Sequence, residues 1–116
     1  MSKTPIGDHA LLSDCHSAAL VDKTGSVVWW CVPRFDSPSV FAGLLDDDAG
    51  HFTIRPTGVR EVTRSYRPES LVLETRFVCD EGEWILTDAL AMAHGVRGHD
   101  LGLESPHMLL RHARCV

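Results

Sequence analysis

Short runs of β-branched and aromatic residues recur along this chain, each bounded by turn residues, and this pattern constrains the fold more than any other feature. The densest run spans residues 26–32 (SVVWWCV). Gly25, directly before it, can adopt the positive φ angle that a tight turn requires. Together with residues 15–22 on the other side of the turn, this run predicts a β-hairpin.

A second hairpin is predicted over residues 71–92, with its turn at Asp80-Glu81-Gly82. Its first strand alternates, so one face is expected to pack on the core. That face consists of Leu71, Leu73, Thr75, Phe77 and Cys79. Further strands are predicted over residues 51–56, 59–66 and 107–116.

One segment departs from the strand pattern. Residues 39–46 (SVFAGLLD) place apolar side chains at the spacing of a helical turn, and Ser37-Pro38 is suited to an N-cap and first helical position. We therefore expect one short helix over 39–46. The fold predicted for residues 1–116 is mainly β, an antiparallel β-sandwich with this single short helix.

Composition excludes several classes of protein. The formal net charge is −5 and Lys and Arg do not cluster, which argues against nucleic-acid binding. No apolar stretch approaches the roughly 20 residues of a membrane span. The N-terminal residues lack the apolar region of a signal peptide, so a cytoplasmic protein is expected. Reduced thiols are then expected for Cys15, Cys31, Cys79 and Cys115, whose spacing matches no zinc motif.

Catalytic and metal-binding motifs are sparse. The sequence has no Gly-x-Ser-x-Gly elbow and no phosphate-binding glycine loop. His94, His99 and Asp100 share a glycine-rich segment and could bind a metal together with His107. A solvated loop is the alternative, because zinc ligands usually lie closer together on defined elements. We expect no metal and no cofactor.

The segment 33–38 (PRFDSP), between the predicted 26–32 strand and the predicted helix, is the best candidate site, and two interpretations of it remain open. In the structural one, Arg34 pairs with Asp36 and Phe35 fills the core. In the functional one, aromatic and charged side chains form a rim that binds carbohydrate. The candidates for this rim are Trp29, Trp30, Arg34, Phe35 and Asp36.

Several short motifs follow one another along residues 5–114, and their order is informative. They are Ile6-Gly7-Asp8, Asp14-Cys15, Ala18-Ala19-Leu20-Val21, Gly25-Ser26, Trp29, Pro33-Arg34-Phe35-Asp36-Ser37-Pro38, Phe41-Ala42, Tyr66-Arg67-Pro68, Leu71-Val72-Leu73-Glu74-Thr75, Gly82 and Thr87-Asp88. Together they resemble the N-terminal region of bacterial trehalase-like and glucoamylase-like proteins of glycoside hydrolase family fifteen.

The resemblance implies an N-terminal β-sandwich, part of a larger supersandwich, that precedes a helical α/α barrel. In that family the barrel carries two catalytic glutamates, a general acid and a general base, and no position here matches their motifs. It therefore implies a domain with no catalytic residue, whose partner is the missing C-terminal catalytic barrel and whose ligand is an α-glucoside such as trehalose or a maltooligosaccharide. Residues 107–116 read as a strand that stops without a polar tail, so we expect a C-terminally truncated chain.

Three positions depart from the family pattern: His16 stands where arginine is frequent, Val28 where aspartate is frequent, and Trp30 where an aliphatic residue is usual. The fold expectation is unaffected, and whether this hairpin contacts sugar stays open. A standalone carbohydrate-binding module and an inactive gene remnant are the alternative functions. A small metal-dependent enzyme built on residues 94–107 ranks last.

Overall fold

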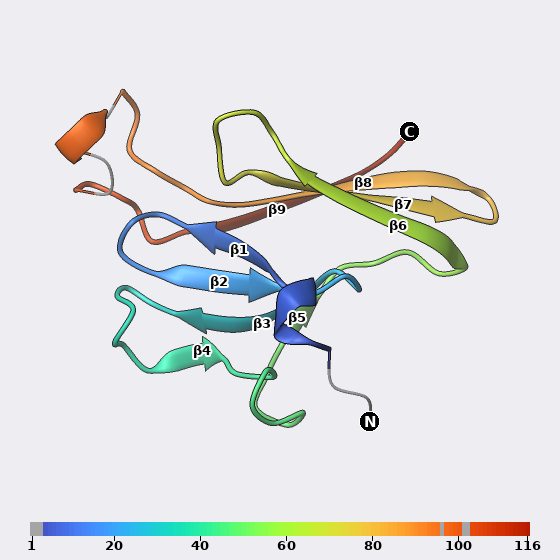
Figure 1. Cartoon of the computed structure of the whole chain (residues 1–116), viewed down its shortest axis with the longest axis horizontal. Helices are drawn as coiled ribbons and strands as arrows, with labels where there is room; N and C mark the ends of the chain where they lie inside the picture. Colours follow the sequence, from blue (N-terminus) through green and yellow to red (C-terminus); the bar gives the residue numbers. More distant parts are fainter. Residues whose placement is uncertain (1–3, 96, 101–102) are drawn as a thin grey trace.

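The computed structural model describes residues 4–95, 97–100 and 103–116 as two antiparallel β-sheets packed face to face (Figure 1). In the first sheet, β1 (Ala10–Ser13), β2 (Ala18–Val21), β3 (Ser26–Cys31) and β4 (Ser39–Phe41) lie in sequence order, and β5 (Phe52–Thr53) also pairs with β3. The second sheet has the order β6 (Val59–Tyr66), β7 (Leu73–Cys79), β8 (Gly82–Leu90) and β9 (Leu109–Cys115). Two single-turn 3-10 helices, η1 (Ile6–Asp8) and η2 (Gly98–Asp100), lie outside the sheets.

The mainly β fold and both predicted hairpins are confirmed. The β2–β3 hairpin turns at Gly25, whose φ of 81° lies in the left-handed region, and the β7–β8 hairpin turns at Asp80-Glu81, directly before Gly82. The predicted strand over residues 15–22 is shorter than expected, because Cys15 has a φ of 73° and the chain extends only from Ala18. Strand β1 was not predicted at all.

The helix predicted over residues 39–46 is wrong. Ser39–Phe41 form β4, in which Ser39 pairs with Cys31 and Phe41 with Trp30. The hydroxyl of Ser37 accepts a hydrogen bond from the Arg34 N–H (3.0 Å). Pairing along β3 and packing of Phe41 against the core stabilise the strand, and this tertiary contact outweighs a weak local helical pattern.

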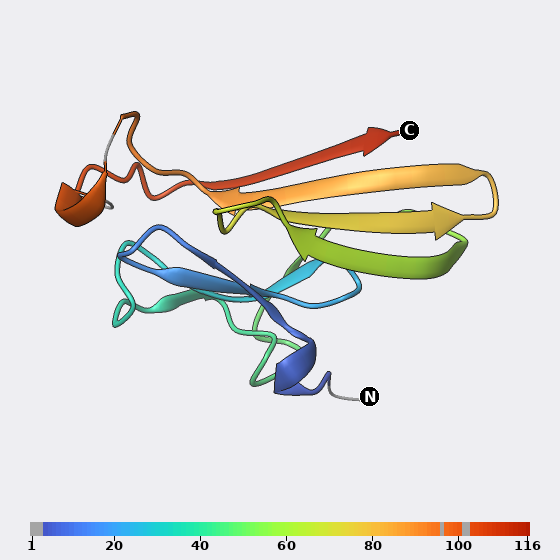
Figure 2. The ribbon, with the colours of Figure 1, turned by 45° about the horizontal axis from the view of Figure 1, so that its top comes forward.

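The core lies between the two sheets. The first sheet contributes Leu12, Ala19, Val21 and Val27, and the second contributes Leu73 and Leu90. The middle of the predicted β7 face is confirmed, since Leu73, Thr75 and Phe77 are buried while Arg76 is exposed. Its two ends are not, because Leu71 precedes the strand and is exposed, and Cys79 is half-buried. The second sheet is longer and extends past the first toward the β7–β8 turn (Figure 2).

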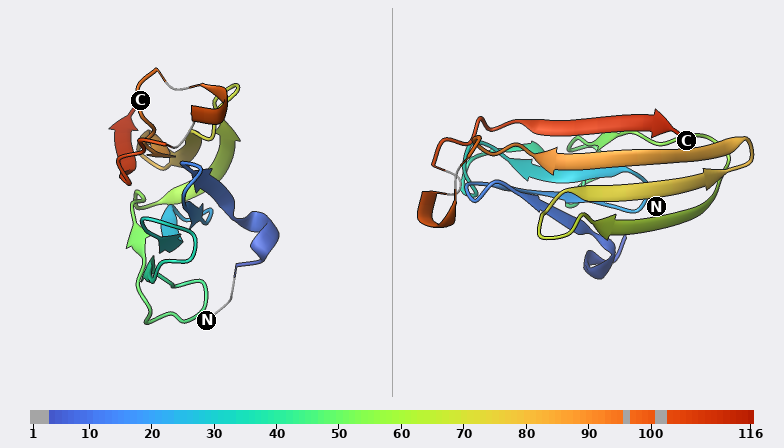
Figure 3. Two further views of the ribbon diagram at one scale, coloured as in Figure 1. Left: turned by 90° about the vertical axis from the view of Figure 1, so that its left-hand side faces the viewer. Right: turned by 90° about the horizontal axis from the view of Figure 1, so that it is seen from above.

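The sandwich has two distinct ends along its long axis. The β8–β9 connection lies at one end and the β7–β8 turn at the other (Figure 3). The β1–β2 turn and the β3–β4 loop share the end occupied by the β8–β9 connection, as hydrogen bonds among these segments require. No helix in the described ranges is both long and apolar enough to cross a membrane.

Candidate functional site

The β3–β4 loop, which contains residues 33–38, is held by hydrogen bonds to itself and to the β1–β2 turn. The Phe35 N–H donates to the carbonyl oxygen of His16 (2.9 Å), and the Ser37 N–H donates to that of Arg34 (3.1 Å). These bonds satisfy backbone groups of a segment that belongs to no strand. The loop is therefore a fixed corner whose position depends on the β1–β2 turn.

This fixed corner presents its side chains to solvent. Arg34 Nε lies 3.3 Å from Asp36 Oδ1, and the two side chains are 73% and 77% exposed. The expected Arg34–Asp36 pair is thus present. Phe35 is 61% exposed, so the expectation that it fills the core is wrong.

An open pocket of about 540 Å³ lies where this loop meets the β1–β2 turn. Arg34, Phe35 and Asp36 line it from the loop, and Cys15 and His16 line it from the turn. The pocket thus combines an aromatic ring, a cation, an imidazole and one carboxylate. A pocket of this composition can pack an apolar ring face while hydrogen-bonding hydroxyl groups around it.

Asp14 organises the turn behind the pocket. Its side chain is fully buried, and Oδ1 accepts hydrogen bonds from the N–H groups of His16 (3.0 Å) and Ser17 (2.9 Å). This is the local pattern by which aspartate shapes turns. The sequence singled out Asp14 as part of a motif only, and the turn-forming preference of aspartate was the available signal for its role.

A third segment, from the end of the β8–β9 connection, packs on this turn. Ser105 Oγ donates to the Asp14 carbonyl oxygen (3.2 Å), and His107 Nδ1 lies 3.8 Å from Asp14 Oδ2. The rings of His16 and His107 meet edge to face, with centroids 5.9 Å apart. Sequence reasoning placed His107 in a candidate metal site instead.

The structure does not bring all five candidate rim residues together. Trp30 pairs with Ala19, packs against the core, and donates from Nε1 to Ser17 Oγ (3.3 Å). Trp29 pairs with Leu20 on the opposite face of the sheet, because successive side chains of a strand alternate. Neither tryptophan lines the pocket that Arg34, Phe35 and Asp36 share.

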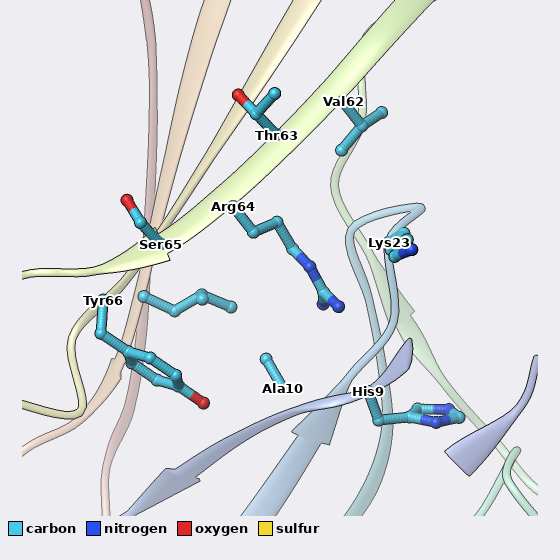
Figure 4. A pocket seen from close by; sticks show the side chains of 9 residues that line it. His9, Ala10, Lys23, Val62, Thr63, Arg64, Ser65 and Tyr66 are labelled. Carbon is cyan, nitrogen blue, oxygen red and sulfur yellow. The ribbon is translucent and has the colours of Figure 1, made fainter. Parts of the chain in front are cut away.

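A second cavity, of about 510 Å³, lies between β1 and β6 on the flank of the sandwich (Figure 4). Arg64 reaches from β6 across to the first sheet, where Nη1 donates to the Val21 carbonyl oxygen (3.0 Å) and Nη2 to that of Asp8. The Tyr66 hydroxyl donates to the Leu11 carbonyl oxygen and accepts from the Leu11 N–H, both at 2.9 Å. These groups are engaged in joining the sheets, so the first pocket is the better candidate site.

The described residues do not support the metal-site alternative. Within those ranges, no three His, Cys, Asp or Glu side chains are arranged to hold a metal ion. His107 lies beside Asp14 instead, and the side chain of His99 lies outside the described residues.

Comparisons with known proteins cover nearly the whole chain. The model of a family described as "Trehalase-like, N-terminal" matches residues 1–99. Trehalases from Mycolicibacterium smegmatis and Mycobacterium tuberculosis are 44% and 43% identical to this chain, and each alignment covers 97% of the chain. Trehalase 2 of Sulfolobus acidocaldarius is 45% identical over 74% of the chain. No solved structure matches at a significant level.

The relatives are much longer than this chain. The chain spans 18% of the length of each of the two mycobacterial proteins and 15% of the Sulfolobus protein.

Proposed function

This chain belongs to the family of trehalase-like N-terminal domains, and from that membership we propose that residues 1–116 act as the non-catalytic N-terminal β-sandwich domain of a glycosidase. The proposed substrates of the whole enzyme are α-glucosides, trehalose first and maltooligosaccharides second. The relatives named trehalase support this proposal, because the chain aligns along nearly its full length with a small part of each.

The observation that carries the non-catalytic role is the single carboxylate of the candidate pocket. Hydrolysis of a glycosidic bond requires two carboxyl groups placed about 5–10 Å apart across the substrate. Among the described residues that line this pocket, only Asp36 carries a carboxylate, and it is exposed and paired with Arg34. Its environment lacks the burial that turns a carboxyl group into a general acid.

We assign the domain two tasks: packing on a catalytic α/α barrel, and presenting the β3–β4 loop to the substrate pocket of that barrel. The fixed backbone of the loop supports the second task, since a preorganised surface loses little conformational entropy on binding. Arg34, Phe35 and Asp36 form the proposed rim. Trp30 supports the rim indirectly through its bond to Ser17, and Trp29 would contact a ligand only from the other face of the sheet.

We place the whole glycosidase, of which this chain is the proposed N-terminal domain, in the cytoplasm. All four cysteines are free thiols, and two of them, Cys15 and Cys115, are exposed. Exposed unpaired thiols are usual in a reducing compartment.

The proposal is tested with a chimera. The segment of Mycolicibacterium smegmatis trehalase that aligns with this chain is deleted, and in a second protein it is replaced by this chain. We expect the deletion to abolish trehalose hydrolysis and the chimera to restore it, whereas the chain of 116 residues alone releases no glucose. Glucose release by the chain alone would overturn the non-catalytic assignment.

The role of the loop is tested in the same chimera. The double variant Arg34→Ala/Asp36→Ala is expected to lower kcat/KM for trehalose by about tenfold, since it removes charged hydrogen-bonding groups from the rim. The matched control is Arg60→Ala/Asp80→Ala, an exposed ion pair (3.6 Å) whose Asp80 belongs to the β7–β8 turn. Equal activity of the two double variants would contradict the loop assignment.

A standalone carbohydrate-binding module is the second candidate, because the pocket is formed entirely within this chain. Calorimetric titration of trehalose and of maltose into the isolated chain separates the candidates. Saturable heat that disappears in the Phe35→Ala variant would favour the module. Absence of heat at millimolar sugar, together with an inactive chimera, would favour an inactive gene remnant.

A further inference from the structure

One buried acceptor at the candidate site has no hydrogen-bond partner in the part of the chain that the structure describes. Asp14 is fully buried, and its Oδ1 is occupied by the N–H groups of His16 and Ser17. Oδ2 accepts no hydrogen bond from any described residue. A buried carboxylate oxygen left without a donor carries a desolvation cost that a new donor would relieve.

The nearest donor belongs to the segment 103–107, which we call the strap. His107 Nδ1 stops 3.8 Å from Oδ2, about an ångström beyond hydrogen-bond distance. The strap is already anchored next to this gap, because buried Ser105 donates to the Asp14 carbonyl oxygen. A small shift of one imidazole would therefore complete the contact.

The backbone has an unusual conformation on both sides of the gap between His107 Nδ1 and Asp14 Oδ2. His107 has a φ of 55° and Cys15, directly after Asp14, has a φ of 73°. Residues other than glycine persist in the left-handed region when surrounding contacts hold them there. The strap and the turn thus face each other in a defined geometry.

Among the described residues, the titratable groups that face His107 come from the β1–β2 turn, which contributes Asp14 and the ring of His16. Arg34 and Asp36 of the β3–β4 loop line the pocket of His16 and so lie one residue further away. Glu104 is exposed within the strap itself.

We propose that the strap is a pH-dependent latch, in which protonation of His107 favours its closure onto Asp14 Oδ2 and loss of that proton weakens the contact. A protonated imidazole donates from both nitrogens, and a charged hydrogen bond is roughly twice as strong as a neutral one. Histidine changes charge between about pH 5 and pH 8, so closure is favoured at the acidic end of this range and weakens toward the alkaline end. If His16 also becomes protonated, its repulsion of His107 reduces the gain at the most acidic pH.

The latch regulates the pocket, and this consequence rests on the proposed function. Asp14 shapes the turn whose His16 carbonyl oxygen holds the Phe35 N–H. A closed strap therefore stabilises the wall against which the β3–β4 loop is fixed. With the strap open, Oδ2 adds no bond to that wall, which keeps the bonds to Oδ1 and the Ser105 bond to the Asp14 carbonyl oxygen.

The test is amide hydrogen exchange, followed by NMR, on the full chain at about pH 5.5 and about pH 8, with rates corrected for the intrinsic pH dependence of exchange. Protection of the His16 and Ser17 amides and of the described strap amides is expected to fall by about tenfold toward the higher pH. His107→Gln, which stays neutral throughout, is expected to show equal protection at both pH values. His112→Gln, an exposed histidine on β9, is the matched control and is expected to keep the pH dependence.

Protection that is independent of pH in the unsubstituted chain would overturn the latch, and so would pH dependence that survives in His107→Gln. Asp14 itself is left intact, because Oδ1 holds the turn and its loss would unfold the region being measured. The measurement involves neither sugar nor hydrolysis. Its outcome is therefore independent of whether the chimera is active.

Discussion

Arg111 in β9 and Asp88 in β8 form a buried ion pair, with Nε 2.6 Å from Oδ1 and the side chains only 2% and 0% exposed. Arg111 also reaches the first sheet, where Nη1 donates to the Phe52 carbonyl oxygen (2.6 Å) and Nη2 to that of Gly25 (2.7 Å). Nη2 makes a second, longer bond to Asp88 Oδ2 (3.3 Å). The guanidinium also lies 4.9 Å from the centre of the Phe52 ring. One side chain thus joins the two sheets.

We expect Arg111→Met to lower the free energy of unfolding by about 3–5 kcal/mol, because it leaves the Asp88 carboxylate buried without a partner. Urea denaturation followed by tryptophan fluorescence measures the change. Arg114→Met, at an exposed position of the same strand, is the matched control and should stay within about 0.5 kcal/mol of the unsubstituted chain. Equal stability of the two variants would contradict the assigned role of the pair.

Gly25→Ala should destabilise the chain by more than about 2 kcal/mol, because overpacking costs about 1–3 kcal/mol and a left-handed alanine adds to it. Gly25 has a φ of 81°, and a Cβ atom there would overlap the Ile54 carbonyl oxygen. Gly7→Ala is the control, since no atom lies within 4 Å of the Cβ position. Equal midpoint temperatures of thermal unfolding for the two variants would refute this prediction.

Removing the Arg34–Asp36 pair should leave stability unchanged to within about 0.5 kcal/mol, because exposed ion pairs contribute little. Urea denaturation of Arg34→Ala/Asp36→Ala in the isolated chain checks this expectation. A stable double variant makes any loss of chimera activity a loss of function at the loop. A large loss of stability would mean that the pair holds the corner.

The isolated chain is expected to self-associate through β9. This strand lies at the edge of the second sheet, pairs with β8 without any irregularity, and exposes Leu110. Long, regular edge strands with exposed apolar side chains promote association. Light scattering at increasing protein concentration measures it.

Leu110→Lys should reduce this association, because a charge on an edge strand opposes pairing with another strand. Leu103→Lys adds the same charge at an exposed position outside the strands and serves as the control. Monodisperse monomer of the unsubstituted chain at high concentration would contradict the prediction.

The sequence predicted most of the sheet architecture because strand signals are local. Alternation in β7 and the glycine of the β2–β3 turn identified both hairpins, and each depends on residues close in the chain. The segment 39–46 misled the prediction for the same reason. Its helical spacing is a local signal, whereas its strand pairs with Trp30 and Cys31 through a register that no local pattern contains.

By itself, the sequence determined the class of fold, the positions of the longer strands and turns, and the order of motifs that places the chain in its family. Only the tertiary structure decided which side chains meet. It placed the side chains of Trp29 and Trp30 on opposite faces of the sheet and left Phe35 exposed. It also brought His107 next to Asp14 and Arg111 next to the Gly25 turn. The physical reason is that side-chain periodicity specifies which face of a strand is buried. The partner across the core depends on how the two sheets pack on each other, which no periodicity within one strand specifies.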